Sequence, residues 1–249
     1  MRTVLALLAC LTLAACTTGA DGSSQETLTV VAAASLTESF TELEKEFEAD
    51  HRSVDVRLAF DSSATLAQQL IEGAPADVLA TADERTMRSA VAADVVDGPP
   101  DVFATNEMVL VVPAGNPAGI ERFTDLDDGG VDYVTCAESA PCGAAARTLL
   151  EANGIGSAPK SLEVDVKAVL NKVVLDEADA GLVYATDARA AGDAVQSIPV
   201  PQSETAVNRY PIAVSTDSSH PDLAAKWIES VLSDRGQRLL RDNGFGPPP

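Results

Sequence analysis

The stretch from Leu28 to Leu36, LTVVAAASL, constrains the fold of this chain more than any other segment. Its apolar, β-branched first half is typical of a strand that is buried on both faces. A helix is expected next, because apolar residues recur at helical spacing at Leu36, Phe40, Leu43 and Phe47. Ser35 therefore lies at a strand-to-helix corner, where its hydroxyl and free helical N–H groups can bind an anion. Taken alone, it can also be an ordinary helix N-cap.

The same kind of corner recurs once in the next fifty residues, at Asp61-Ser62-Ser63. The alternating strand Val54–Phe60 runs into Asp61-Ser62-Ser63 and a helix that ends near Gly73. A strand over residues 76–81 is followed by Asp83, the expected cap of a helix over residues 84–91. This βαβαβ order predicts a parallel sheet with right-handed crossovers.

The second half of the chain repeats the pattern after a predicted loop at residues 93–100. A long apolar strand over residues 106–113 is expected to carry the chain into a second lobe. Two more corners follow. One is Pro141-Cys142-Gly143, before a helix from about Ala144, and the other is Asp165-Val166, where Asp165 or the residue before it is expected to cap the next helix.

A buried strand over residues 180–187 then places the Tyr184 hydroxyl near its carboxyl end. The segment 210–214 is predicted to cross back to the first lobe, before helices over residues 223–232 and 235–241. The pattern predicts two α/β lobes joined by two extended crossings, with helix N-termini facing the cleft between them.

The N-terminus predicts export. Met1-Arg2 and the apolar run from Val4 to Ala15 form a secretory signal that is too short to span a bilayer. Leu13-Ala14-Ala15-Cys16 resembles a bacterial lipoprotein signal, which implies cleavage after residue 15 and a lipid on Cys16. Plain secretion is the alternative. Residues 16–26 are then expected to form a flexible tether, and no later segment is apolar enough to span a membrane.

The formal net charge of −21 gives no support for nucleic-acid binding. It would also repel an anionic ligand at long range, although screening limits this effect because the Debye length is about 8 Å at physiological salt. A desolvated site can then be dominated by the dipoles that line it.

Two cysteines, Cys136 and Cys142, remain after export and lipidation. In an oxidising compartment they are expected to form a disulfide that closes a short loop. A metal pair is the competing interpretation, although the two histidines, His51 and His220, occur elsewhere in loop-like positions.

Together these motifs resemble the periplasmic molybdate-binding proteins of ABC transporters, in lipoprotein form. The resemblance runs from about Leu28 to Phe245 and is carried by segments that occur in one order: AASL at 33–36, FDSS at 60–63, GAPADV at 73–78, PCG at 141–143, DV at 165–166 and GLVY at 181–184. It implies a two-lobed type II periplasmic-binding fold with mixed, mostly parallel sheets. Lobe one would span residues 27–106 plus 207–249, and lobe two would span residues 107–206.

The resemblance further implies a ligand, a site and partners. The ligand would be a tetrahedral oxyanion, molybdate or tungstate, with no cofactor and no catalysis. Ser35 and Ser63 would bind it through hydroxyl and backbone N–H, Cys142 and Val166 through backbone N–H, and Tyr184 through its phenol. The protein would act as a monomer anchored to the outer face of the cell membrane, where it would deliver the oxyanion to ABC permease subunits.

Two residues depart from the family's usual pattern. Asp61 stands where a small or neutral residue is more common, and a carboxylate there opposes a dianion unless it points away. Cys142 replaces a frequent alanine, which matters little if only its backbone binds.

Two alternative functions remain from the sequence. The same fold could bind sulfate, phosphate or another small anion. An exported enzyme is the third possibility, but the sequence holds no G-x-S-x-G, P-loop, H-E-x-x-H or G-x-G-x-x-G motif.

Overall fold

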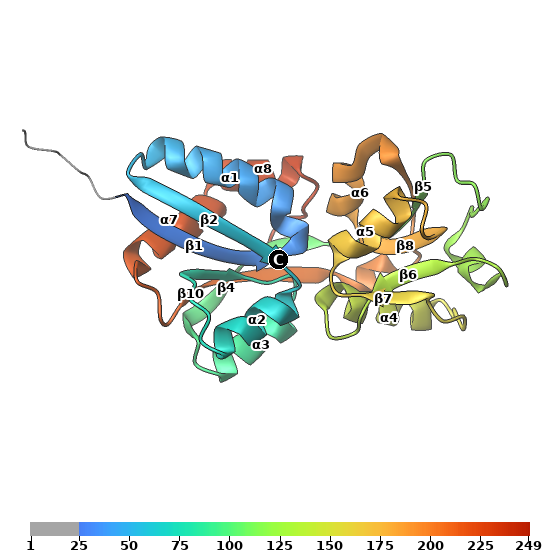
Figure 1. Cartoon of the computed structure of the whole chain (residues 1–249), viewed down its shortest axis with the longest axis horizontal. Helices are drawn as coiled ribbons and strands as arrows, with labels where there is room; N and C mark the ends of the chain where they lie inside the picture. Colours follow the sequence, from blue (N-terminus) through green and yellow to red (C-terminus); the bar gives the residue numbers. More distant parts are fainter. Residues whose placement is uncertain (1–24) are drawn as a thin grey trace, which may run out of the picture.

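Two five-stranded sheets divide the computed structural model into two halves, which we call lobe 1 and lobe 2 (Figure 1). The structure describes residues 25–249. The predicted signal peptide at 1–15, the lipidation site Cys16 and most of the predicted tether lie outside these residues. Strand β1 begins at Glu26, so it includes the last residue of the range predicted as tether.

Lobe 1 contains the sheet with strand order β2-β1-β3-β10-β4. Strand β1 runs parallel to β2 and β3, whereas β10 runs antiparallel to β3 and β4, so the sheet is mixed. Its elements are β1 (Glu26–Ala33), the 3-10 turn η1 (Ala34–Leu36), α1 (Thr37–Asp50), β2 (Val54–Asp61), α2 (Ser63–Ile71), β3 (Val78–Ala80), α3 (Glu84–Ala92), β4 (Val96–Asn106), β10 (Asn208–Ser215), α7 (Pro221–Leu232) and α8 (Asp234–Asp242).

Lobe 2 contains the sheet with strand order β7-β6-β8-β5-β9, which is also mixed. The chain enters lobe 2 at Glu107 and returns between β9 and β10. Its elements are β5 (Met108–Pro113), η2 (Phe123–Asp127), β6 (Tyr133–Cys136), α4 (Pro141–Ala152), β7 (Ser161–Glu163), α5 (Val166–Val174), β8 (Ala180–Tyr184), α6 (Ala185–Ala191), η3 (Gly192–Ala194), β9 (Val195–Ile198) and η4 (Ser203–Ala206).

The fold class and the parallel βαβαβ unit are confirmed, but two predicted elements are wrong. Residues 96–100 belong to β4 and not to a loop. Gly98 and the two prolines after it suggested a break, yet β4 is an edge strand, where proline is tolerated. The strand predicted over residues 180–187 ends at Tyr184 and is followed by α6, because a short apolar run does not distinguish a strand from a buried helix.

Each lobe has its own apolar core. In lobe 1, the fully buried Trp227 of α7 packs edge-on against Phe40 and Phe47 of α1, at ring-centroid distances of 5.6 and 5.3 Å. These contacts bury the apolar face of α1, whose helical spacing in the sequence predicted this helix. In lobe 2, Val169 and Val173 of α5 are buried against β8 at Gly181. The absence of a side chain at Gly181 therefore sets how closely α5 approaches the sheet.

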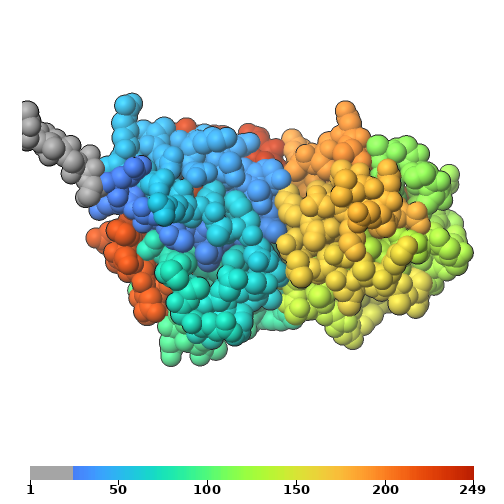
Figure 2. All heavy atoms as spheres, in the orientation of Figure 1, coloured from blue at the N-terminus to red at the C-terminus, as the bar shows by residue number. Residues whose placement is uncertain are grey.

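The two lobes contact each other across the cleft (Figure 2). Lys167 Nζ of α5 lies 2.7 Å from Glu38 Oε1 of α1. On another part of the boundary, Arg85 of α3 donates to the carbonyl of Ser139 in lobe 2, at 3.0 Å. These contacts link the two lobes on both sides of their boundary. No helix within residues 25–249 has the length and apolar character needed to cross a membrane.

Replacing Gly181 with alanine is expected to destabilise lobe 2. The added Cβ would lie 2.8 Å from Val169 Cγ1 and 2.9 Å from Val173 Cγ2, so these valine side chains or α5 itself must shift. Overpacking of this kind costs about 1–3 kcal/mol of unfolding free energy, which denaturant titration would measure. Gly129→Ala is the matched control, because a Cβ there meets no heavy atom of the described residues within 4 Å. Equal stability of the two variants would contradict this packing account.

Candidate functional site

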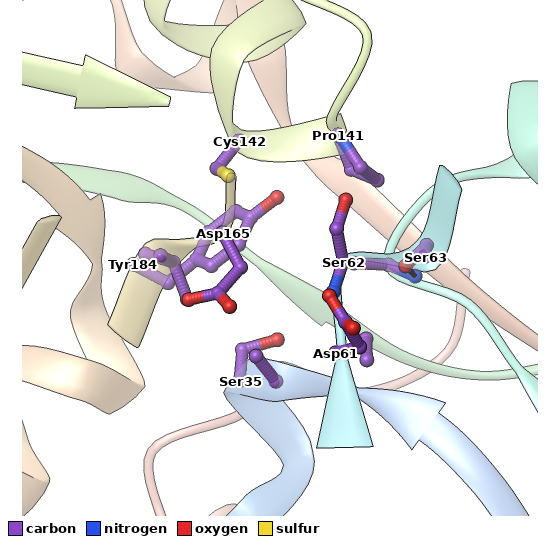
Figure 3. Close-up of a pocket in the computed structure, with 12 residues that line it drawn as sticks. Ser35, Asp61, Ser62, Ser63, Pro141, Cys142, Asp165 and Tyr184 are labelled. Carbon is purple, nitrogen blue, oxygen red and sulfur yellow. Dashed lines mark hydrogen bonds between the residues drawn. The ribbon is translucent and has the colours of Figure 1, made fainter. Parts of the chain in front are cut away.

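A small pocket lies between the lobes, where the carboxyl ends of strands meet the N-termini of helices (Figure 3). The cavity is about 10 Å³, roughly the room for one water-sized group, so the lobes leave little free space between them in this arrangement. All five residues predicted to bind the oxyanion line it. The complete lining is Ala33, Ala34, Ser35, Asp61, Ser62, Ser63, Ala82, Pro141, Cys142, Asp165, Val166 and Tyr184.

Ser35 lies in the 3-10 turn η1 between β1 and α1, as the strand-to-helix corner predicted. The alternative role as a helix cap is wrong, because Leu36 occupies the N-cap position of α1 and no side chain caps that helix. The Ser35 Oγ instead lies 2.9 Å from the hydroxyl oxygen of Tyr210, on β10 of the same lobe. This hydrogen bond to Tyr210 therefore fixes the Ser35 hydroxyl while the residue lines the pocket.

Ser63 opens α2 and is buried. Its Oγ accepts a hydrogen bond from the N–H of Ala82 at 2.9 Å, so its own hydrogen remains available to the pocket. Ser62 is the N-cap of α2, and its side chain caps no helical N–H. Sequence reasoning did not select Ser62, although its place in the FDSS motif could have identified it.

Asp61 lines the pocket and does not turn away from it. Its Oδ1 accepts a hydrogen bond from the N–H of Ser62 at 2.6 Å. The carboxylate thus occupies one backbone donor at the entry to α2 and brings a negative charge to the site. The sequence analysis identified this arrangement as unfavourable, because the Asp61 carboxylate opposes a dianion in the pocket.

Cys142 lies in the first turn of α4, which begins at Pro141, three residues earlier than predicted. The disulfide to Cys136 is present, which excludes the competing metal pair. It closes a loop that is short enough to stabilise the fold by roughly 2 kcal/mol on entropic grounds. A Cβ at Gly143 would lie 2.0 Å from the carbonyl oxygen of Ala137, so only glycine allows the loop to pack this closely against α4.

Val166 is the first residue of α5. Asp165 is the N-cap, as predicted, and its Oδ1 accepts a hydrogen bond from the N–H of Ala168 at 2.9 Å. The N–H of Val166 has no intrahelical partner, which is the usual state of a first-turn donor. Asp165 also lines the pocket, so the site contains a second carboxylate that the sequence identified only as a cap.

Tyr184 ends β8 and brings a phenol into the pocket from lobe 2 (Figure 3). Its hydroxyl is buried and has no hydrogen-bond partner among the described residues. Burial raises the pKa of Tyr184 well above its usual value, so the phenol keeps its hydrogen at neutral pH. An unpartnered buried hydroxyl is costly unless a ligand accepts from it.

Among residues 25–249, no lysine, arginine or histidine lines the pocket. The nearest cation along the chain is Lys167, which follows Val166 but is engaged with Glu38 and, at 3.0 Å, with Asp187 of α6. Burial opposes the charged form of Lys167, but the two carboxylates outweigh it and raise its pKa. The groups offered to a ligand are therefore neutral hydroxyl and backbone N–H donors, beside two carboxylates.

The pocket residues can bind and orient a small anion, and they do not form a catalytic constellation. Serine, tyrosine and backbone groups line the pocket without a histidine that could act as a base. Within residues 25–249, no group of three or more His, Cys, Asp or Glu residues is placed to hold a metal ion. The convergence of helix N-termini is the arrangement that favours an anion.

Comparison with known proteins agrees with this geometry. Residues 28–246 match the family described as bacterial extracellular solute-binding protein. The chain is 43% identical over 221 residues to the molybdate-binding protein ModA of Mycobacterium tuberculosis, which covers 89% of this chain and 85% of that protein.

Two solved structures support the fold. One is the sulfate-binding protein SubI from Mycobacterium tuberculosis, with a TM-score of 0.79, 23% identity and coverage of 89% of this chain and 87% of that one. The other is the periplasmic molybdate-binding protein of Azotobacter vinelandii, with a TM-score of 0.77, 18% identity and coverage of 89% of this chain and 100% of that one. The chain therefore belongs to the family of bacterial extracellular solute-binding proteins.

Proposed function

We propose that this protein captures molybdate, and tungstate with it, in the pocket between its lobes and delivers the oxyanion to an ABC permease. The observation that carries the proposal is the convergence on one small pocket of Ser35 and Ser63 from lobe 1 with Cys142, Val166 and Tyr184 from lobe 2. The 43% identity to a molybdate-binding protein supports the choice of ligand. The same family membership makes the chain a binding protein and not an enzyme.

Neutral donors suit a fully deprotonated dianion. Each oxygen of such an anion accepts hydrogen bonds, and hydrogen bonds to a charged partner are roughly twice as strong as those between neutral groups. Each helix N-terminus adds about 0.3–1 kcal/mol of favourable dipole interaction. A protonated anion such as hydrogen phosphate is disfavoured at the backbone N–H groups, because its O–H finds no acceptor there; its O–H would have to face Asp61, Asp165 or a hydroxyl oxygen.

Sulfate is the second candidate ligand. Like molybdate, it is tetrahedral and carries no proton at neutral pH, so donors alone do not reject it. The similarity in fold to the sulfate-binding protein SubI keeps this possibility open. Cavity size is then the property that must separate the two ions.

Three further features complete the proposal. Lipidation of Cys16 would hold the protein at the outer face of the membrane, with residues 16–26 as a tether. The lobes, bounded at residues 27–106 plus 207–249 and at 107–206, would open and close about their two crossings. A single chain contains every group of the site, so a monomer suffices for binding.

Titration of the purified protein tests the ligand directly. Molybdate and tungstate are expected to bind at micromolar concentration or below and to raise the melting temperature, because a ligand that binds only the folded state stabilises it. Isothermal titration calorimetry would compare both ions with sulfate and phosphate. A response to sulfate alone would select the second candidate, and no response to molybdate would contradict the proposal.

Removing the Ser35 hydroxyl or the Tyr184 hydroxyl from the pocket is expected to weaken binding of the oxyanion. Ser35→Ala and Tyr184→Phe should each cost roughly 1–3 kcal/mol of binding free energy, the usual penalty for losing a hydrogen bond to a charged partner. Tyr133→Phe is the control, since the Tyr133 hydroxyl donates to Ser157 in lobe 2 and does not line the pocket. Unchanged calorimetric affinity in both test variants would show that the site is misassigned.

Neutralising Asp61 is expected to strengthen oxyanion binding. Asp61→Asn keeps an oxygen that can accept from the Ser62 N–H, but it removes a charge that repels the dianion. Two unit charges about 6 Å apart interact by roughly 3 kcal/mol at an effective dielectric constant near 20, so a gain of at least about tenfold in affinity is expected. Asp193→Asn, at an exposed position away from the pocket, controls for net charge. Weaker binding by Asp61→Asn would mean that the carboxylate assists the ligand.

A further inference from the structure

A chain of hydrogen bonds runs from the pocket to the crossing between the lobes. Ser35 Oγ and Tyr210 OH are 2.9 Å apart. Asn106, the last residue of β4, donates through Nδ2 to Tyr210 OH at 3.4 Å and to Thr186 Oγ1 of lobe 2 at 2.8 Å. All four side chains are buried. Neither Tyr210 nor Asn106 lines the pocket, so they act on the site through the pocket residues that Tyr210 contacts, Ser35 by a hydrogen bond and Tyr184 by ring packing.

The orientation of the Asn106 amide is determined by its other contact. Its Oδ1 accepts the N–H of Glu107 at 3.0 Å, so the NH₂ group must face Thr186 and Tyr210. The Tyr210 oxygen thus receives a hydrogen from Asn106. Its own hydrogen is then free to be donated to Ser35 Oγ, and the Ser35 hydrogen is free to be donated into the pocket.

Ser63 provides a parallel within the same lobe. Its Oγ accepts a hydrogen bond from the backbone N–H of Ala82, which likewise leaves the Ser63 hydroxyl hydrogen available to the pocket. The backbone fixes the donor role of Ser63, whereas side chains fix that of Ser35. Both serines are therefore supplied with a donor on the side away from the ligand.

We infer that Tyr210 and Asn106 are positioning residues that orient the Ser35 hydroxyl so that its hydrogen points into the pocket, and so favour fully deprotonated oxyanions over protonated ones. The inference rests on the proposed function, because it concerns how the same pocket selects its ligand. It also links selection to closure, since Asn106 reaches Thr186 across the lobe boundary.

Two structural details support a fixed role for Tyr210. Burial raises its pKa, so the phenol remains protonated at any physiological pH and always has a hydrogen to donate. The ring is clamped by edge-on contacts with Phe245 at 5.3 Å and Tyr184 at 6.0 Å. Its strand has a register shift at Tyr210 and Pro211, a type of irregularity that redirects side chains in sheets.

A double-mutant cycle tests the inference with molybdate as the probe. Tyr210→Phe is expected to lower the affinity about tenfold in the unaltered protein and to have little effect in a Ser35→Ala background, where no hydroxyl remains to be oriented. The ratio of molybdate to hydrogen phosphate affinity is also expected to fall in Tyr210→Phe, because the Ser35 oxygen becomes free to accept. Tyr133→Phe serves as the control for loss of a buried tyrosine hydroxyl.

Asn106→Asp provides a second variant in case Tyr210→Phe folds poorly. A carboxylate at this position accepts from the Tyr210 hydroxyl, which turns the Ser35 hydrogen away from the pocket, so weaker molybdate binding is expected. Thermal unfolding without ligand verifies that each variant folds.

The outcomes separate this inference from the proposed function. If the unaltered protein binds molybdate but Tyr210→Phe loses the same affinity with and without Ser35, Tyr210 has only a structural role and the inference is overturned. No loss of affinity in Tyr210→Phe and Asn106→Asp overturns it as well. If the unaltered protein binds none of the oxyanions, the proposed function is overturned and this inference with it.

Discussion

Parallel pairing of strands is the constraint on which the site depends. Because β1 runs parallel to both β2 and β3, the helices that follow these strands start from the same edge of the lobe 1 sheet. In lobe 2, β6 runs parallel to β7 and β8 in the same way. Each edge therefore presents several helix N-termini, whose first N–H groups have no partner within the helix. When the two edges face each other, these donors enclose a single small space, and no side-chain cation is needed to make it attractive to an anion.

This arrangement reconciles a strongly acidic chain with an anionic ligand. The net charge of −21 acts through solvent and is screened within about 8 Å at physiological salt. The donors act at contact distance in a water-poor pocket, where the same interaction is much stronger. Asp61 and Asp165 are exceptions to screening because they line the pocket itself. Each of them accepts a backbone N–H of its own helix N-terminus, which disperses part of its charge.

The sequence predicted what is local and missed what is brought together from distant parts of the chain. Strand-to-helix corners at Ser35, Ser63 and Asp165 were identifiable because each combines a strand, a hydroxyl or carboxyl residue and an amphipathic helix. The start of β4 was missed because its glycine and prolines are tolerated only at a sheet edge, and edge position is a tertiary property. The bond between Ser35 and Tyr210 joins residues 175 positions apart, so no spacing in the sequence could indicate it.

The hydrogen-bond chain behind Ser35 connects ligand choice to lobe closure. A ligand that only accepts hydrogen bonds can use every donor in the pocket, including the buried Tyr184 hydroxyl, which otherwise has no partner among the described residues. A protonated ligand whose O–H faces one of these donors, and not Asp61 or Asp165, brings two hydrogens together, and in a buried site that mismatch is costly. Tyr184 belongs to lobe 2 and packs against Tyr210 of lobe 1, so the mismatch would act at the surface where the lobes meet. Closure around an anion that mismatches these donors is therefore less favourable than closure around one that matches them, and this discrimination needs no cationic side chain in the pocket.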